Sequence, residues 1–238
     1  MILDIMKTDF RGIVNIAGDD ILESLITGSV IPTLSRALKD AKREDNISTY
    51  FGPGSPEADK QIRVESMYGL FIPIAEFYMH LMEHGYEVLQ QSVQNITSLD
   101  SLNDYLLANN LRPLRGFNYL NYLTKYNIFN EVDFSNLNIP GLVPKVDELE
   151  KIVMNRYKPI LVRYAVVINQ YKPNFLILGG RTTSLPIISK QLREYLTIAP
   201  QRIIRLNNYF TGVWYPFSKE GKISDPKTGV VIGNSISH

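Results

Sequence analysis

The chain has 238 residues and a formal net charge of +1, with 45% of its residues hydrophobic and 21% charged, which is typical of one large folded domain or two lobes. It contains no cysteine, which excludes disulfides and thiolate chemistry, and no run of basic residues that would indicate a nucleic-acid partner. No apolar stretch approaches the roughly 20 residues of a membrane span, and the start shows no signal-peptide pattern, so we expect a cytoplasmic protein.

A short strand and a helix are predicted at the beginning of the chain. The apolar residues 13–16 are typical of a strand. A helix should follow Gly18-Asp19-Asp20, because Asp at the first turn satisfies free amides and suits the helix dipole. Apolar residues at helical spacing continue this helix, and we expect an irregularity near Gly28 and Pro32.

A second helix is predicted over about 57–84. Its apolar residues recur at intervals of three and four, Pro73 should kink it, and Gly85 should end it. The segment 98–143 is rich in Asn, Leu and Tyr and contains only short helical pieces. We expect it to form a small inserted lobe, whereas residues 1–97 and 144–238 form the main lobe.

The last third of the chain predicts alternating helices and strands. A helix from about Val146 to Tyr171, bent at Pro159, leads to a strand over 174–178. A helix that ends near Leu196 follows, then a strand over 202–206 and a final short helix near 225. This order indicates an α/β fold with a mixed sheet and flanking helices.

The strand over 174–178 ends in Gly179-Gly180 and passes directly into a helix. Two glycines allow a ligand to approach the backbone closely, and the start of a helix offers free amides. The hydroxyls of Thr182, Thr183 and Ser184 could cap this helix and also contact a nucleoside. A glycine turn that binds nothing explains the same pattern equally well.

Two other groups of polar residues are candidates for metal chemistry. Asp19 and Asp20 could hold Mg²⁺ through water, but capping of the helix is the favoured interpretation. His80, Glu83 and His84 match H-x-x-E-H, the inverted signature of a class of zinc peptidases. They lie at a helix end and no distant glutamate completes a ligand set, so a metallopeptidase is the least favoured alternative.

Two segments resemble the second half of the actin/Hsp70-like ATPase domain, which has a ribonuclease H-like fold. Residues 15–21 are similar to the glycine-acid turn that follows the second phosphate loop of that superfamily. Residues 175–186 are similar to its adenosine motif, in which a strand, paired glycines and polar residues precede a helix that begins with proline. The resemblance implies an α/β domain that binds ATP and Mg²⁺.

A closer resemblance is to the C-terminal region of the SrfB-like family of bacterial virulence-associated proteins. Segments of that family similar to residues 17–21, 180–186 and 211–228 occur in the same order. The helix over about 62–83 also fits, so the resemblance covers about two-thirds of the chain. The segment 98–143 has no counterpart among these motifs.

The resemblance implies positions for a bound adenine nucleotide. The adenosine would lie beside Gly179, Gly180 and Arg181, with Thr183 or Ser184 near the base. The phosphates and Mg²⁺ would lie toward Gly18 and Asp19. Asp225 would lie on the last helix, behind the nucleotide.

The chain lacks the part of the actin/Hsp70 pattern that contains the catalytic groups. Both glycine-rich phosphate loops of the superfamily precede the region seen here, and residues 4–9 contain no glycine. Without those loops the groups that stabilise phosphoryl transfer are missing, so we assign no catalytic residue. We expect an ATP-binding half that does not hydrolyse ATP alone and that works with a protein partner or with the rest of a longer chain. The alternative is a degenerate actin-like module that binds a protein and no nucleotide.

Overall fold

The computed structural model describes residues 18–40, 64–115, 137–179, 181–206, 209–212, 218–219 and 221–223. Most residues in these ranges are helical, and none of the helices found there is both long and apolar enough to cross a membrane. The predicted strand over 13–16, the predicted helix near Asp225 and residue Gly180 lie outside the described residues.

The first described element is a helix with a wider turn inside it. α1 (Gly18–Leu25), the π-helical turn η1 (Ile26–Val30) and α2 (Ile31–Asp40) follow one another without a break. In η1 the N–H of Ile31 donates to the carbonyl of Ile26, five residues back. The turn widens just before Pro32, whose ring would clash with a carbonyl of a regular helix. The predicted helix start and the predicted irregularity are both confirmed.

The second predicted helix has the same construction. The π-helical turn η2 (Met67–Phe71) leads into α5 (Ile72–His84), in which Pro73 lies in the first turn. Gly85 ends the helix with φ 81°, a conformation that suits glycine. The predicted end at Gly85 is confirmed, the predicted kink at Pro73 stays a prediction, and residues 57–63 lie outside the described residues.

α5 is the central helix of the helical part of the molecule. Its neighbours in the chain are α6 (Tyr86–Val93) and α7 (Leu99–Ala108). α7 begins with a capping box in which Ser98 and Ser101 bond to each other's backbone N–H. Because α5 is enclosed by other helices, eight of its thirteen residues are buried: Pro73, Ile74, Ala75, Phe77, Tyr78, Met79, Leu81 and Met82.

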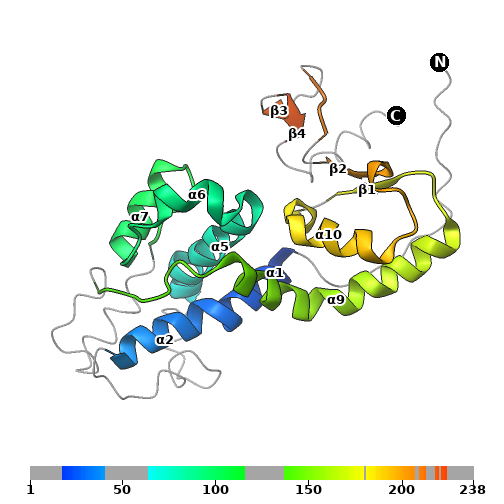
Figure 1. Ribbon diagram of the computed structural model, residues 1–238. Helices are drawn as coiled ribbons and strands as arrows, with labels where there is room; N and C mark the ends of the chain where they lie inside the picture. The colour runs from blue at the N-terminus through cyan, green and yellow to red at the C-terminus, as the bar shows by residue number, and fades with distance from the viewer. Residues whose placement is uncertain are drawn as a thin grey trace.

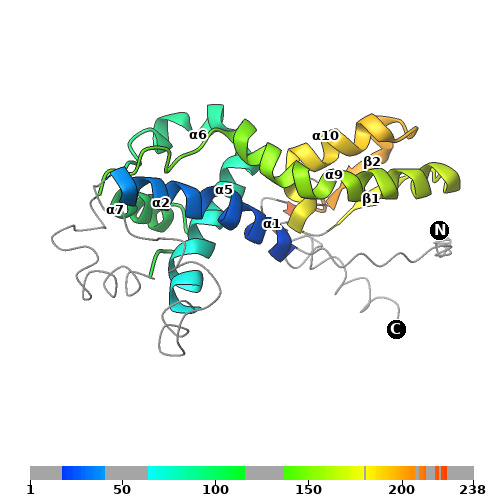
Figure 2. The ribbon, with the colours of Figure 1, turned by 90° about the horizontal axis from the view of Figure 1, so that it is seen from below.

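The long helix α9 (Val146–Tyr171) connects the helical part with the strands, as Figure 1 and Figure 2 show. It contacts α1, α5 and α10. Its buried side chains recur every four residues, so one stripe of the helix faces the core. These side chains are Leu149, Val153, Tyr157, Leu161 and Ala165. The predicted bounds of this helix are confirmed, and Pro159 lies inside it, where the predicted bend stays a prediction.

A β–α–β unit follows α9. β1 (Leu176–Leu178) is followed by the short 3₁₀ helix η3 (Arg181–Ser184), by α10 (Pro186–Tyr195) and by β2 (Ile203–Arg205). β1 and β2 pair in parallel, with Leu176 opposite Ile203 and Leu178 opposite Arg205. A short antiparallel hairpin is made by β3 (Ser218–Lys219) and β4 (Lys222–Ile223).

The β–α–β unit is the part of the predicted α/β fold that the described residues contain. It is shorter than predicted, because β1 and β2 each have three residues. A mixed sheet and a ribonuclease H-like fold stay predictions for the whole chain. The same holds for the lobe boundaries at 98 and 143.

Candidate functional site

The segment after β1 leads into α10 through one short 3₁₀ helix. Gly179 follows the strand, η3 makes one 3₁₀ turn, and Pro186 opens α10. A Cβ atom at Gly179 would lie 3.2 Å from Cδ1 of Leu206, so a larger residue would push against the residue that follows β2. Arg181 is placed as the first residue of η3.

A pocket of about 330 Å³ lies between α9, β1, η3 and α10. Gly179, Thr182 and Thr183 form its wall on the side of the turn. The opposite walls are largely apolar and include Tyr157, Ile160, Tyr164, Leu178, Ile188 and Leu192. Two predicted site residues, Gly179 and Thr183, therefore line one pocket.

Ser184 has a different environment from Thr183. Its hydroxyl donates a hydrogen bond to the carboxylate of Glu83, near the end of α5. The bond joins residues 101 positions apart in the chain and holds η3 against α5. Thr183 borders the pocket, whereas Ser184 links two elements.

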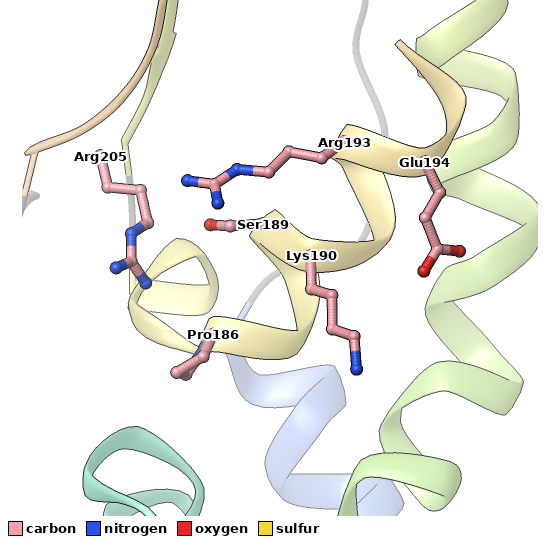
Figure 3. A pocket seen from close by; sticks show the side chains of 6 residues that line it. All are labelled: Pro186, Ser189, Lys190, Arg193, Glu194 and Arg205. Carbon is pink, nitrogen blue, oxygen red and sulfur yellow. The ribbon is translucent and has the colours of Figure 1, made fainter. Parts of the chain in front are cut away.

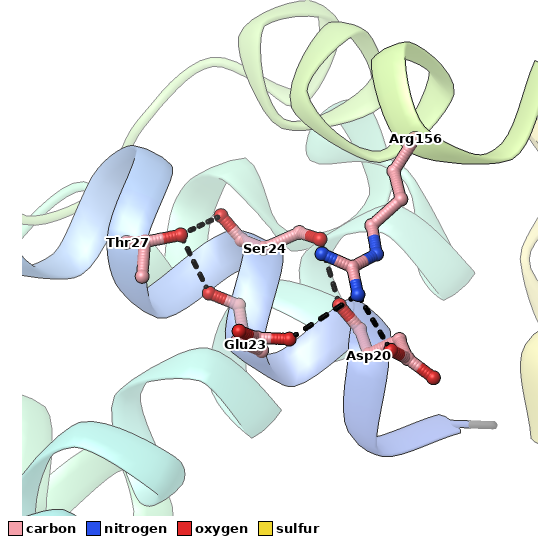
Figure 4. Close-up of polar contacts among 5 residues, drawn as sticks. All are labelled: Asp20, Glu23, Ser24, Thr27 and Arg156. Atoms are coloured by element: carbon pink, nitrogen blue, oxygen red, sulfur yellow. Dashed lines mark hydrogen bonds and ion pairs between the residues drawn. The ribbon is translucent and has the colours of Figure 1, made fainter. Parts of the chain in front are cut away.

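The first turn of α1 is tied to α9. The guanidinium of Arg156 lies 2.7 Å from Asp20 Oδ1 and 3.4 Å from Glu23 Oε2 (Figure 4). The carboxylate of Asp20 therefore links α1 to α9, whereas the neighbouring Asp19 is exposed. α1 also contacts η3, so the two segments that carry the resemblance lie next to each other in the fold.

Tyr157 lines the pocket and interacts electrostatically with both Asp20 and Arg156. Burial raises the pKa of Tyr157 to about 12, and the negative charge of Asp20 acts in the same direction. The phenol therefore stays protonated at neutral pH and can donate a hydrogen bond. Its aromatic ring forms part of the pocket wall.

The H-x-x-E-H residues lie close together at the end of α5. The rings of His80 and His84 are 4.2 Å apart between centroids, and His84 Nδ1 donates to the carbonyl of His80 at 3.1 Å. Glu83 accepts the bond from Ser184. In the described ranges no group of three His, Asp or Glu side chains is placed to hold a metal ion.

Sequence reasoning missed the contribution of α9 to the pocket. Tyr157, Tyr164 and Ile168 come from this helix, and their spacing of seven and four residues places them on one face. That spacing was visible in the sequence, but it indicates only that the face is apolar. Gly180 and Asp225 lie outside the described residues, and Gly18 begins α1.

Comparison with known proteins identifies a family. The family model described as virulence factor SrfB matches residues 5–238, including the segment 98–143 for which the sequence motifs had no counterpart. No curated protein and no solved structure matches the chain. The match extends over nearly the whole sequence, so the chain belongs to the virulence factor SrfB family.

Proposed function

We propose that this chain is the adenine-nucleotide-binding half of an actin/Hsp70-like ATPase, that it works in the cytoplasm and that it does not hydrolyse ATP alone. The observation that carries the proposal is the pocket beside Gly179. It lies where the resemblance to the adenosine motif expects a nucleoside, at the end of a strand that leads into a helix that begins with proline.

The walls of the pocket suit a flat base. Its volume of about 330 Å³ is at the lower end of the range of small-molecule sites. Aliphatic side chains and the rings of Tyr157 and Tyr164 would contact the faces of the adenine, and the hydroxyl of Thr183 stands at the border of the pocket. Thr183 is the proposed neighbour of the base, because it lines the pocket and Ser184 is not among the lining residues.

The proposed phosphate side is the start of α1. Asp19 is exposed there and could bind Mg²⁺ through water, whereas the carboxylate of Asp20 pairs with Arg156. α1 contacts η3, which supports a ligand that extends from the pocket toward Gly18 and Asp19. One such acidic residue does not replace two phosphate loops, and for this reason we propose binding without hydrolysis.

Thermal unfolding with and without excess Mg-ATP tests the proposal, with Mg-ADP and Mg-GTP for comparison. Ligand at 100 times its dissociation constant adds about 2.7 kcal/mol to the free energy of unfolding. For a chain of this size the midpoint should rise by roughly 5–10 °C. ATP and ADP should both raise it, and GTP should raise it less.

A pair of tyrosine variants locates the binding. Tyr164→Ala removes a ring from the pocket, and the loss of stacking on a base is worth about 1–3 kcal/mol. Tyr171→Ala removes a ring from the same helix, where the side chain is 53% exposed. Only Tyr164→Ala should weaken ATP binding. Equal affinities in both variants would place any bound nucleotide elsewhere.

The second candidate function is a protein-binding module without nucleotide. Phe175, just before β1, and Ile177, within it, are 56% and 51% exposed, and exposed apolar side chains of this size favour contact with another protein surface. An unchanged unfolding midpoint at millimolar ATP would favour this candidate. The partner could be another protein or the rest of a longer chain.

A further inference from the structure

A second pocket, of about 530 Å³, lies on another side of α10. Its lining comes from α10 and from the end of β2: Pro186, Ser189, Lys190, Arg193, Glu194 and Arg205. Ile188 and Leu192 of the same helix face the pocket beside Gly179 instead. The two pockets therefore share a helix and no lining residue.

Ser189 is a buried polar residue whose hydroxyl makes no hydrogen bond within the described part of the chain. The residue is 3% exposed, and Ser189 Oγ has no hydrogen-bond partner among the described residues. A serine in a helix commonly bonds back to a carbonyl of the preceding turn, which does not happen here. Buried hydroxyls without a partner are costly and rare, so this one indicates a group that the described residues do not supply.

Two arginine side chains line the same pocket as Ser189. In Figure 3 the side chains of Arg193, from α10, and of Arg205, from β2, lie on the same side of α10 as the hydroxyl of Ser189. Neither arginine belongs to an ion pair in the described part of the chain, where the ion pairs are made by Arg112 and Arg156. Two cations that line one pocket repel each other unless an anion binds there.

The other charged residues of this pocket point elsewhere. In Figure 3 the side chains of Lys190 and Glu194 leave α10 in directions away from the two guanidinium groups. Lys190 acts electrostatically on Glu150 of α9, and its charge partly offsets the rise that burial and Asp147 cause in the pKa of that carboxyl group. The positive charge of Arg193 and Arg205 is thus left without a carboxylate from α10.

We propose that Ser189, Arg193 and Arg205 bind a phosphate group. A phosphate dianion carries the charge that neutralises two guanidinium groups, and its oxygens accept hydrogen bonds from several directions. A carboxylate would neutralise only one arginine. The ligand is free phosphate or the phosphate monoester of a small molecule, and the site is independent of the nucleotide proposed for the pocket beside Gly179.

Isothermal titration of the full chain with inorganic phosphate at pH 7.5, at an ionic strength held constant with chloride, tests the site. Three variants remove one partner each: Ser189→Ala, Arg193→Gln and Arg205→Gln. Arg163→Gln is the matched control, because Arg163 is an exposed residue of α9 and the change in charge is the same. Each site variant should weaken phosphate binding about tenfold or more, since a hydrogen bond to a charged group is lost.

Ser189→Ala still tests the phosphate site if one of the arginine variants does not fold. It removes a hydroxyl without a partner in the described chain, so the unfolding midpoint should not fall. A parallel titration with glycerol 3-phosphate separates the sources of the phosphate: tighter binding than inorganic phosphate indicates a monoester, and weaker binding indicates the free ion. Tyr164→Ala should leave phosphate binding unchanged, which separates this site from the nucleotide pocket.

Three results would overturn the proposal. The first is no heat of binding up to about 10 mM phosphate, a concentration well above a dissociation constant of about 1 mM. The second is the same loss of affinity in Arg163→Gln as in the site variants, which would mean general attraction to a cationic surface. The third is acetate binding as tightly as phosphate, which would assign the three residues to carboxylates.

Discussion

His80 shows how strongly the surroundings of one side chain change its chemistry. It lies on α5, its Nε2 is buried without a hydrogen-bond partner among the described residues, and the ring of His84 is 4.2 Å away between centroids. Burial lowers the pKa of His80 to about 4, and the like charge of His84 adds to the effect. In the folded protein His80 is therefore neutral at pH 7 and at pH 5.

A dependence of stability on pH follows from this shift. In the unfolded chain the imidazole has its ordinary pKa of about 6.5, so between pH 6.5 and pH 4 the unfolded state binds more protons than the folded state. The contribution of neutral His80 to the free energy of unfolding is therefore fully present above about pH 6.5. It is lost as the pH falls from about 6.5 toward 4. We expect the free energy of unfolding in urea to fall by about 1–2 kcal/mol from pH 7.5 to pH 5, after allowance for partial exposure of the ring.

The variant His80→Gln isolates this contribution. It removes the titrating group, so its loss of stability between pH 7.5 and pH 5 should be smaller than that of the unchanged protein. His84→Gln removes only the second cause of the shift and should have an intermediate effect. Identical pH profiles for the unchanged protein and His80→Gln would mean that His80 is accessible to protons in the folded state.

At the scale of elements, the two π-helical turns have one sequence pattern. Gly28 and Gly69 each begin a Gly-x-x-Ile-Pro segment, and each lies at the third position of its π turn. Proline removes the N–H that would bond to the carbonyl four residues earlier. For Gly69 that carbonyl accepts from the backbone N–H of Arg115 at 2.7 Å instead. The irregular turn thus attaches a later segment of the chain to the helix.

The packing of α1 on α9 includes an ion pair whose contribution to the free energy of unfolding can be measured. Arg156 is 44% exposed and contacts both Asp20 and Glu23. Exposed pairs contribute little, so Arg156→Met should cost about 0.5–1 kcal/mol of unfolding free energy, and less in 1 M salt. Lys158→Met, an exposed residue of the same helix, is the control and should cost less.

A double-mutant cycle with Asp20→Asn separates the pair from other effects of the substitution. The coupling between residues 156 and 20 should equal most of the loss in Arg156→Met, because the two groups are 2.7 Å apart. A coupling of zero would mean that the aliphatic part of Arg156 stabilises the contact through packing.

At the scale of the whole molecule, most buried apolar residues of the described chain belong to one connected cluster. It includes Leu102 of α7, Leu114 and Ile139, which belong to the segment predicted as an inserted lobe, together with residues of α1, α5, α9 and α10. The backbone N–H of Ile139 also donates to the carbonyl of Thr97. The described parts of 98–143 thus share their core with the rest of the described chain.

Two leucines of α7 test whether this segment unfolds separately. Leu102 is fully buried and Leu107 is 55% exposed. Leu102→Ala should lower the free energy of unfolding by about 2–5 kcal/mol, and Leu107→Ala should have a much smaller effect. In urea, circular dichroism and the fluorescence of the single tryptophan should report one shared transition. Two separate transitions would support an independent lobe at 98–143.

The sequence by itself determined several helix bounds in the described chain, although α6 was not predicted. Proline, glycine and apolar spacing act within a few residues, and for this reason the start of α1, the irregular turn before Pro32 and the whole of α9 were predictable. The order of segments also pointed to the SrfB family, which the family match confirms.

Only the tertiary structure decided which of the polar residues meet. Ser184 and Glu83 are 101 residues apart and Arg156 and Asp20 are 136 apart, so no local pattern relates them. The pocket beside Gly179 and the pocket that Ser189, Arg193 and Arg205 line likewise depend on how α9, α10 and β2 pack. Side chains far apart in a chain are brought together by the burial of apolar faces, and that burial is a property of the whole fold.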